Sequence, residues 1–202
     1  MATSTLGFAL LGLLARKPRT GYDLTQAMRQ PIGYFWSASH SQVYPELAKL
    51  EAAGFVGHAV IDGPGPRDTK RYSITADGRR VLAEWAAQPA ATATGRDEFL
   101  LKIYSLWLVD PARARELISA QRTAHQAQLE HYEQIAREVE SEQADKLGDP
   151  ATPEFSSYAT LRRGLSFERH ARDWCDWLLG ALADPVPGRP ADVPRLRRAQ
   201  DS

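Results

Sequence analysis

Leucines at helical spacing near the start of the chain predict a first helix with one buried face. They recur every three or four positions over about residues 4–15: Leu6, Leu10, Leu13 and Leu14. Thr20 and Asp23 have the spacing of a capping box, with aspartate in place of the usual glutamate, and predict a second helix to about residue 30. The pattern therefore predicts two short helices, the second ended by Pro31 and a following glycine.

A third helix is predicted from Ser39 or Ser41, either of which can cap it, to Gly54, which has the position of a left-handed C-cap. One face of this helix is apolar: Val43, Leu47 and Leu50. The opposite face is polar: Gln42, Glu46 and Lys49. This amphipathic pattern predicts that the polar face is exposed to solvent and available for contacts.

Two extended segments follow, over residues 55–61 and 69–75, on either side of the turn sequence Gly63-Pro64-Gly65-Pro66. We expect a β-hairpin whose rim is basic: Arg67, Lys70 and Arg71. Thr75 is placed to cap a fourth helix that runs to about Trp85. Three helices, two strands and a further helix in this order are typical of a winged helix-turn-helix.

The second half of the chain is predicted to be helical. Residues 88–95 are uncharged and rich in alanine and threonine, which is typical of a linker. Apolar residues three or four positions apart then predict a short helix over 97–108 and long helices over about 111–146 and 153–183. At 1.5 Å per residue each long helix reaches about 45 Å, and its apolar stripe exceeds what one helical hairpin can bury. A partner helix is therefore expected.

These elements predict a mainly α fold of the α+β class, with a winged helix-turn-helix DNA-binding domain over residues 1–88 and a helical dimerisation or effector domain over residues 96–184. Residues 185–202 contain four prolines and little apolar surface, and are expected to form a disordered tail. The 25 Lys and Arg balance the 25 Asp and Glu overall, but residues 1–85 carry 10 against 7 and residues 96–184 carry 11 against 16. This division indicates a polyanion-binding domain coupled to a domain with another task.

The polar face of the third helix has the chemistry of a DNA-reading surface. Such a helix fits the major groove, which is about 12 Å wide, and glutamine can read adenine there with two hydrogen bonds. Serine and tyrosine hydroxyls suit phosphate or base contacts. The candidate DNA-binding residues lie on the second helix, the third helix and the hairpin: Tyr22, His40, Ser41, Gln42, Tyr44, Lys49, Arg67, Lys70 and Arg71. The alternative is a surface helix whose polar face meets only water.

Three motifs in this region resemble the PadR-like family of transcriptional regulators. They are GYDL at residues 21–24, SQVYPEL at residues 41–47 and RDTKRYSITADG at residues 67–78. The resemblance covers about residues 5–88, and the remainder resembles the longer helical domain of the branch that includes virulence-activator-type members. It implies a homodimeric, sequence-specific DNA-binding protein, usually a repressor, whose helical domain dimerises and in some members senses a small molecule.

Enzyme chemistry, metals and cofactors find little support in the sequence. The Gly-Pro repeat at residues 63–66 lacks both the N–H donors and the following lysine of a phosphate-binding loop. The five histidines have no His-Glu-x-x-His spacing, and His125 and His131 fall on different faces of one helix, so no metal site is predicted. Cys175, the single cysteine, lies among tryptophans without an adjacent Lys or His, which favours a structural thiol over a redox sensor.

Aromatic side chains suggest a pocket for a flat apolar effector, since ligand sites often have aromatic walls. The candidates are Trp36, Trp85, Phe99, Tyr104, Trp107 and Trp174. The same residues also suit a protein core or a dimer interface, which is their commoner use, so both interpretations stay open.

The sequence thus predicts a DNA-binding transcriptional repressor that acts as a homodimer on an inverted-repeat operator in double-stranded DNA and is released by a small aromatic effector. A protein-binding winged-helix adaptor without DNA affinity is the alternative, and a small cofactor-free enzyme is a third and weaker one. No apolar run reaches the roughly 20 residues of a membrane span, and the first residues lack the features of a secretory signal. We therefore expect a cytoplasmic protein.

Overall fold

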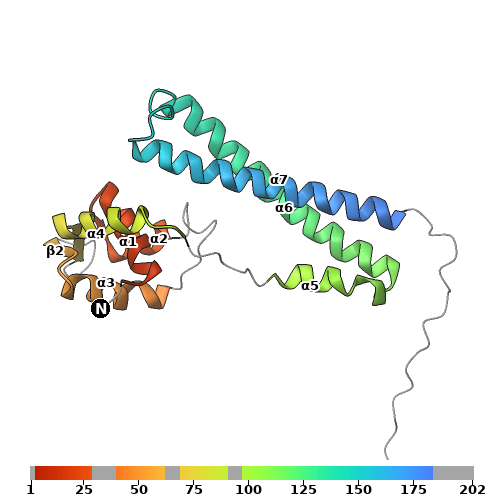
Figure 1. Ribbon diagram of the computed structural model, residues 1–202, viewed down its shortest axis with the longest axis horizontal. Coiled ribbons are helices and arrows are strands. Elements are labelled where there is room, and N and C mark those ends of the chain that lie inside the picture. Colours follow the sequence, from red (N-terminus) through yellow and green to blue (C-terminus); the bar gives the residue numbers. More distant parts are fainter. Residues whose placement is uncertain (1–2, 29–39, 62–68, 91–96, 184–202) are drawn as a thin grey trace, which may run out of the picture. The chain divides into compact units, whose positions relative to one another are not determined.

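The computed structural model describes residues 3–28, 40–61, 69–90 and 97–183. The chain divides into two compact units, residues 1–95 with 136–164, and residues 96–135 with 165–202. Figure 1 shows the helices and strands that make up these units.

Some predicted features lie outside the described residues, and they stay predictions. They are the hairpin turn at 63–66, the end of the second helix at Pro31, most of the linker at 88–95 and the tail at 185–202.

The described winged helix-turn-helix has the predicted order of elements, with one strand added. Its elements are α1 (Thr5–Arg16), β1 (Arg19–Thr20), α2 (Gly21–Ala27), α3 (His40–Ala52), β2 (Val56–Ile61), β3 (Thr69–Ile74) and α4 (Ala76–Ala86). The described part of α2 is shorter than expected, because Met28 already forms its C-cap.

Side-chain caps fix the starts of the first two helices. Ser4 caps α1 by accepting a hydrogen bond from the backbone N–H of Gly7 at 3.0 Å. The predicted capping box of α2 is confirmed: the Thr20 hydroxyl accepts from the N–H of Asp23 at 3.1 Å, and the Asp23 carboxylate accepts from the N–H of Thr20 at 3.2 Å. These bonds, the one from the Thr20 backbone above all, hold the pKa of Asp23 below its ordinary value.

The described strands form one antiparallel sheet in the order β1–β3–β2. Tyr72 of β3 lies opposite Arg19 on one side and His58 on the other, and Thr20 lies opposite Arg71. β1 was not predicted, because a strand of two residues has no periodicity that a sequence pattern can show. It places Arg19 beside the β2–β3 hairpin.

The core of the first unit is rich in leucine and confirms the predicted apolar stripes. It contains the stripe of α3, the buried face of α1 and the residues that meet them from α2 and the sheet: Val43, Leu47, Leu50, Leu10, Leu11, Leu13, Leu14, Leu24, Val56 and Tyr72. Burial of each large apolar side chain contributes roughly 1.5–3 kcal/mol. This core fixes which face of α3 is left for solvent.

A polar junction joins the end of α3 to the start of β2 and of α4. Gly54 has a φ of 74°, the left-handed conformation predicted for its C-cap position. The Thr75 hydroxyl donates to the carbonyl oxygen of Gly54 at 2.8 Å and accepts from the N–H of Gly78 at 3.0 Å, so the predicted cap of α4 is also confirmed. Gly78 packs so closely that a Cβ there would lie 2.2 Å from the carbonyl oxygen of Phe55.

The remaining helices are α5 (Glu98–Tyr104), the 3₁₀ turn η2 (Leu106–Leu108), α6 (Pro111–Gln143) and α7 (Pro153–Ala183). The two long helices are confirmed close to their predicted bounds. The single helix predicted over 97–108 is wrong in its second half, because α5 ends at Tyr104 with Ser105 as its C-cap. The chain then tightens into a 3₁₀ turn and becomes extended at Val109, just before Asp110 and Pro111.

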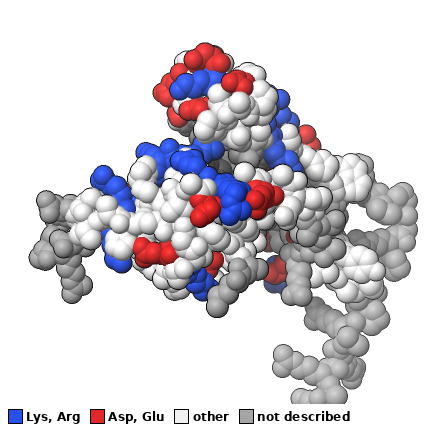
Figure 2. Space-filling model, turned by 60° about the vertical axis from the view of Figure 1, so that its left-hand side comes forward, with Lys and Arg blue, Asp and Glu red and all other residues white. Residues whose placement is uncertain are grey.

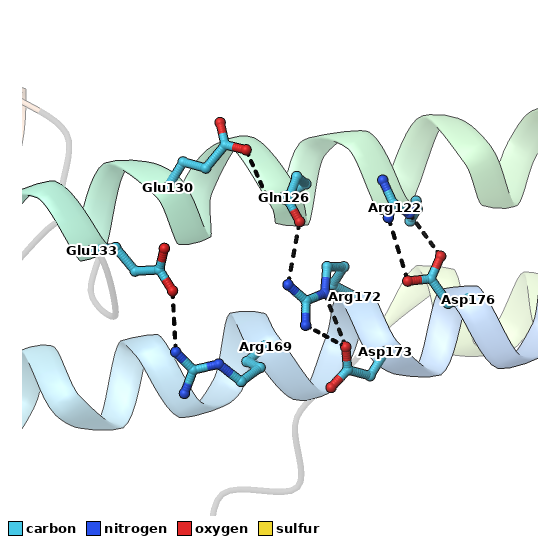
Figure 3. A network of polar contacts seen from close by, with 8 residues as sticks. All are labelled: Arg122, Gln126, Glu130, Glu133, Arg169, Arg172, Asp173 and Asp176. Carbon is cyan, nitrogen blue, oxygen red and sulfur yellow. Dashed lines mark hydrogen bonds and ion pairs between the residues drawn. The ribbon is translucent and has the colours of Figure 1, made fainter.

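Facing polar side chains connect α6 and α7 around a small apolar cluster. Ile118 and Cys175 are fully buried and pack with Leu178. Figure 3 shows the polar network, in which α6 contributes Arg122, Gln126, Glu130 and Glu133, and α7 contributes Arg169, Arg172, Asp173 and Asp176. Arg122 binds Asp176 at 2.7 Å and Arg169 binds Glu133 at 3.1 Å.

Among the helices that the structure describes, none combines the length and the apolar composition that a membrane span needs.

We expect Gly78→Ala to destabilise the first unit by about 1–3 kcal/mol, because the added Cβ must push α4 away from the Phe55 carbonyl. The control is Gly12→Ala in α1, where a Cβ meets no atom within 4 Å. Alanine should stabilise that helix by up to about 1 kcal/mol. Denaturant unfolding measures both changes, and a stable Gly78→Ala variant would contradict the proposed close contact.

Candidate nucleic-acid interface

The first turn of α3 presents polar side chains on the face opposite the core. Ser41 and Gln42 are exposed, while Val43, the next residue, is fully buried. His40 begins the helix, but its side chain lies outside the described residues. The structure thus brings Ser41 and Gln42 together on one exposed surface, where side-chain donors and acceptors can meet base edges or phosphates.

The burial of Glu46 corrects the polar face that was expected for α3. The sequence placed it on the exposed face, but it is only 6% exposed. Its carboxylate accepts hydrogen bonds from the hydroxyl of Ser4 at 2.5 Å and from the ammonium of Lys49 at 3.2 Å. Gly7 makes room for it, since a Cβ there would lie 2.8 Å from the Glu46 Oε1 atom. Glu46 therefore fastens α3 to the start of α1, and Lys49 is an exposed cation whose charge is partly offset.

The ring of Tyr44, a residue of α3, packs against the start of α2. Its ring lies so near Gly21 that a Cβ there would be 2.6 Å from the Tyr44 Cε1 atom. Tyr44 is still about half exposed, and Tyr22, the residue after Gly21, is also exposed. The glycine in the Gly-Tyr motif thus allows the Tyr44 ring to pack against the start of α2.

The basic residues of β3 point to opposite faces of the sheet. Tyr72 is buried on the core side, so Lys70, two residues away, extends from that same face, and Arg71 extends from the other. Both are exposed. Arg67, the third predicted basic residue, lies outside the described residues. Lys70 and Arg71 are therefore separate cationic sites, not one patch.

Arg19 is a candidate that the sequence analysis missed. It lies on β1 beside β3, and together with Arg71 it acts electrostatically on the Asp23 carboxylate. It thus adds a positive charge near the Asp23 carboxylate at the start of α2. The only signal in the sequence was its place just before the capping box, because its strand is too short to predict.

Charges of both signs are mixed on the surface. Figure 2 shows a face on which Lys and Arg side chains lie among Asp and Glu side chains, with uncharged area between them. Arg80 on α4 illustrates the pairing, since it binds Asp77 at 3.3 Å and Glu84 at 3.0 Å. Such pairs lower the net attraction for phosphates, so non-specific DNA affinity is expected to be modest.

Two of the six predicted effector residues are in contact in the second unit. Phe99 and Trp174 meet edge to face with ring centroids 6.0 Å apart, and both pack on the Ile118 cluster. Tyr104 and Trp107 are 85% and 70% exposed. Trp85, in the first unit, stacks on Phe8 at 4.5 Å, and Trp36 lies outside the described residues.

Cys175 is buried, and burial, with a smaller contribution from Asp176, raises the pKa of its thiol. A raised pKa disfavours the reactive thiolate and agrees with a structural role. Within the described residues, no group of three or more His, Cys, Asp or Glu side chains has the geometry to hold a metal ion.

Two family models match this chain. The model described as the transcriptional regulator PadR-like family covers residues 10–84, and the virulence activator alpha C-terminal model covers residues 95–183. The curated relative "Negative transcriptional regulator PadR" of Bacillus subtilis is 32% identical over 183 residues, which are 88% of this chain and 97% of that protein.

Solved structures agree with these matches. The crystal structure of Bacillus subtilis PadR in complex with operator DNA has a TM-score of 0.77 at 30% identity and covers 89% of this chain and 99% of its own. The same protein with p-coumaric acid has a TM-score of 0.74 at 29% identity and covers 90% and 100%. The Vibrio cholerae virulence activator AphA has a TM-score of 0.68 at 32% identity and covers 89% and 98%. The predicted winged-helix fold is confirmed, and this chain belongs to the PadR-like family of transcriptional regulators.

Proposed function

We propose that this transcriptional regulator recognises a specific operator through the exposed first turn of α3. The observation that carries the proposal is the exposure of Ser41 and Gln42 on a helix that is held by the buried Glu46, one turn further along, and at its end by the Gly54 junction. A helix fixed in this way can present the same donors and acceptors to each base pair it meets. The complex of B. subtilis PadR with operator DNA supports this use of the fold.

The candidate DNA-binding residues have different roles in this proposal. Gln42 enters the major groove, where its amide can read adenine, and His40 and Ser41 bind beside it. Tyr22 and Tyr44 bind the phosphate backbone next to the groove, and Lys49 adds a partly neutralised charge. Arg67, Lys70 and Arg71 of the hairpin contact the backbone or the adjacent minor groove. Residues 1–88 form the DNA-binding domain in this proposal.

The helical domain over residues 96–184 is proposed to form a homodimer on an inverted-repeat operator. Five large apolar side chains are more than half exposed within nine residues of α5 and η2: Leu100, Leu101, Tyr104, Trp107 and Leu108. Monomers rarely leave so much neighbouring apolar surface in water. A second copy would cover it, and two linked DNA-binding domains would bind two half-sites.

The proposed activity is repression that a small aromatic effector relieves. The relative from B. subtilis is described as a negative regulator, and it has been crystallised with p-coumaric acid. Phe99 and Trp174 supply an aromatic wall in the second unit of this chain. A regulator that acts on chromosomal DNA works in the cytoplasm, where we place this protein.

Substitution of a base-reading residue and substitution of a phosphate-binding residue should change DNA affinity in different ways. Gln42→Ala should lower the preference for an operator by roughly 1–3 kcal/mol per base contact and leave non-specific affinity nearly unchanged. Lys70→Ala should weaken operator and scrambled duplexes alike and lower the salt slope by about one per phosphate contact, hence by about two in a dimer.

The measurement is duplex affinity at several salt concentrations, with an operator selected from a random pool. Gln88→Ala is the control, because it removes an exposed amide just beyond α4. Equal losses on both duplexes for Gln42→Ala would assign base reading to another residue. An absence of salt-dependent affinity for any duplex would favour the adaptor.

The exposed face of α5 and η2 can be tested with the full chain. Leu101→Ser combined with Trp107→Ser should convert a dimer to a monomer and weaken operator binding by about 10²-fold or more, since the two half-sites are no longer linked. Lys102→Ser is the matched control, because it changes an exposed residue of the same helix without removing apolar surface. Sedimentation gives the mass of each variant, and a dimeric double variant would rule out this interface.

An aromatic effector should be coupled to operator binding in both directions. p-Coumaric acid, used as the probe, is expected to quench tryptophan fluorescence and weaken operator affinity, and operator DNA should weaken p-coumaric acid binding by the same factor. Trp174→Leu should abolish the effect and keep operator affinity. If a panel of aromatic acids changes neither fluorescence nor affinity, these aromatics serve packing alone.

A further inference from the structure

Glu51 and His58 make a polar contact across the turn that joins α3 to β2. Glu51 lies in the last turn of α3, His58 is the third residue of β2, and Gly54 reverses the chain between them. The Nδ1 atom of His58 is hydrogen bonded to the Oε1 atom of Glu51. Both side chains are about one quarter to one third exposed, so the contact lies at the surface edge of the core.

The phenol group of Tyr72 lies beside this contact. Tyr72 of β3 lies opposite His58 with ring centroids 5.8 Å apart, and Arg19 of β1 lies opposite Tyr72. Burial, and then the nearby Glu51 and Tyr44, raise the pKa of Tyr72, so its phenol stays protonated at neutral pH. Glu51 is therefore the acid that acts on both His58 and Tyr72, at the point where α3 meets the hairpin.

The position of this contact matters more than its strength. Exposed ion pairs contribute little to stability, so a purely stabilising role would be small. Glu51 also places a negative charge on a domain that binds a polyanion, which opposes DNA binding. The contact does join α3, with Gln42 at its start, to the strand pair that carries Lys70 and Arg71, so it constrains the angle between these two sets of candidate DNA contacts.

We propose that Glu51 and His58 are positioning residues for operator recognition, which hold the β2–β3 hairpin at a fixed angle to α3 so that both elements reach the DNA together. This inference rests on the proposed function. The pair acts through other residues, and neither of its members needs to touch the DNA.

The direction in which Glu51→Ala changes DNA affinity distinguishes a positioning role from a purely electrostatic one. Glu51→Ala removes a negative charge, so electrostatics alone would tighten binding to every duplex. A positioning role predicts the opposite for the operator: a roughly five- to tenfold loss of affinity, the usual size for coupled neighbours, with scrambled-duplex affinity unchanged or raised. His58→Ala should cause a similar loss, and the double variant should be no worse than either single one.

Two further variants complete the experiment. His58→Asn keeps an amide donor near the position of Nδ1 and should restore most operator affinity, which a role that depends only on the imidazole charge would not allow. Glu84→Ala is the matched control, because it removes an exposed, ion-paired carboxylate of the same domain without touching the α3–β2 turn. It should not lower the preference for the operator. Thermal melting of each variant checks that the domain stays folded.

The duplex used is one that the wild-type protein selects from a random pool, compared with its scrambled sequence. Equal tightening of both duplexes by Glu51→Ala, or additive losses in the double variant, would overturn the positioning role while leaving the proposed function intact. If the wild-type protein does not distinguish the two duplexes, the proposed function fails, and the positioning role fails with it.

Discussion

The hydroxyl of Thr75 joins three elements on whose relative placement any DNA contact depends. Its single proton is shared between two carbonyl oxygens just after α3 and before β2, Gly54 at 2.8 Å and Phe55 at 3.1 Å, and its oxygen caps α4 by accepting from the N–H of Gly78. The backbone N–H of Thr75 also donates to Phe55 at 3.0 Å. Because Gly78 lacks a Cβ, α4 can approach closely enough for this network to form. Consequently α3 and the hairpin are joined at their common root by backbone and side-chain hydrogen bonds, which are directional.

A second constraint acts in the middle of α3. Burying the Glu46 carboxylate is costly unless it is hydrogen bonded, and Ser4 and Lys49 provide the partners. The same serine caps α1, so a single side chain begins one helix and orients another. The core leucines determine which face of α3 is buried, and Glu46 adds a directional contact to that packing. The exposed first turn is therefore presented by a helix fixed along its length.

The features that could be predicted from sequence are those decided by neighbouring residues. The stripe of Val43, Leu47 and Leu50, the capping box at Thr20 and the left-handed Gly54 each depend on a few adjacent positions, and the structure confirms them. The burial of Glu46 could not be predicted, because its partner Ser4 and the space left by Gly7 lie about 40 residues away.

Helical periodicity gave a wrong prediction where the chain changes direction before α6. Residues 97–108 have a helical apolar pattern, yet η2 replaces the last turn of that helix before Pro111. The apolar side chains of this segment suited a core, a dimer interface or a ligand pocket, and Tyr104 and Trp107 are exposed in the single chain. Periodicity reports which side chains are apolar together, but only tertiary structure decides what covers them.

The pairing of charges in the DNA-binding domain limits how its specificity can arise. Lys49 is paired with Glu46, and Arg80 with Asp77 and Glu84, so these basic side chains are already partly neutralised before DNA arrives. A domain of this kind attracts any duplex only weakly, because the counterion release that drives non-specific binding scales with the number of phosphates it neutralises. Weak general attraction leaves discrimination to a few groove contacts whose geometry must be correct, and to the linkage of two half-sites in the proposed dimer. The attachment of α3 through Glu46 and at the Gly54 junction then follows as a requirement of the proposed recognition, since a helix that could tilt would lose the proposed groove contacts.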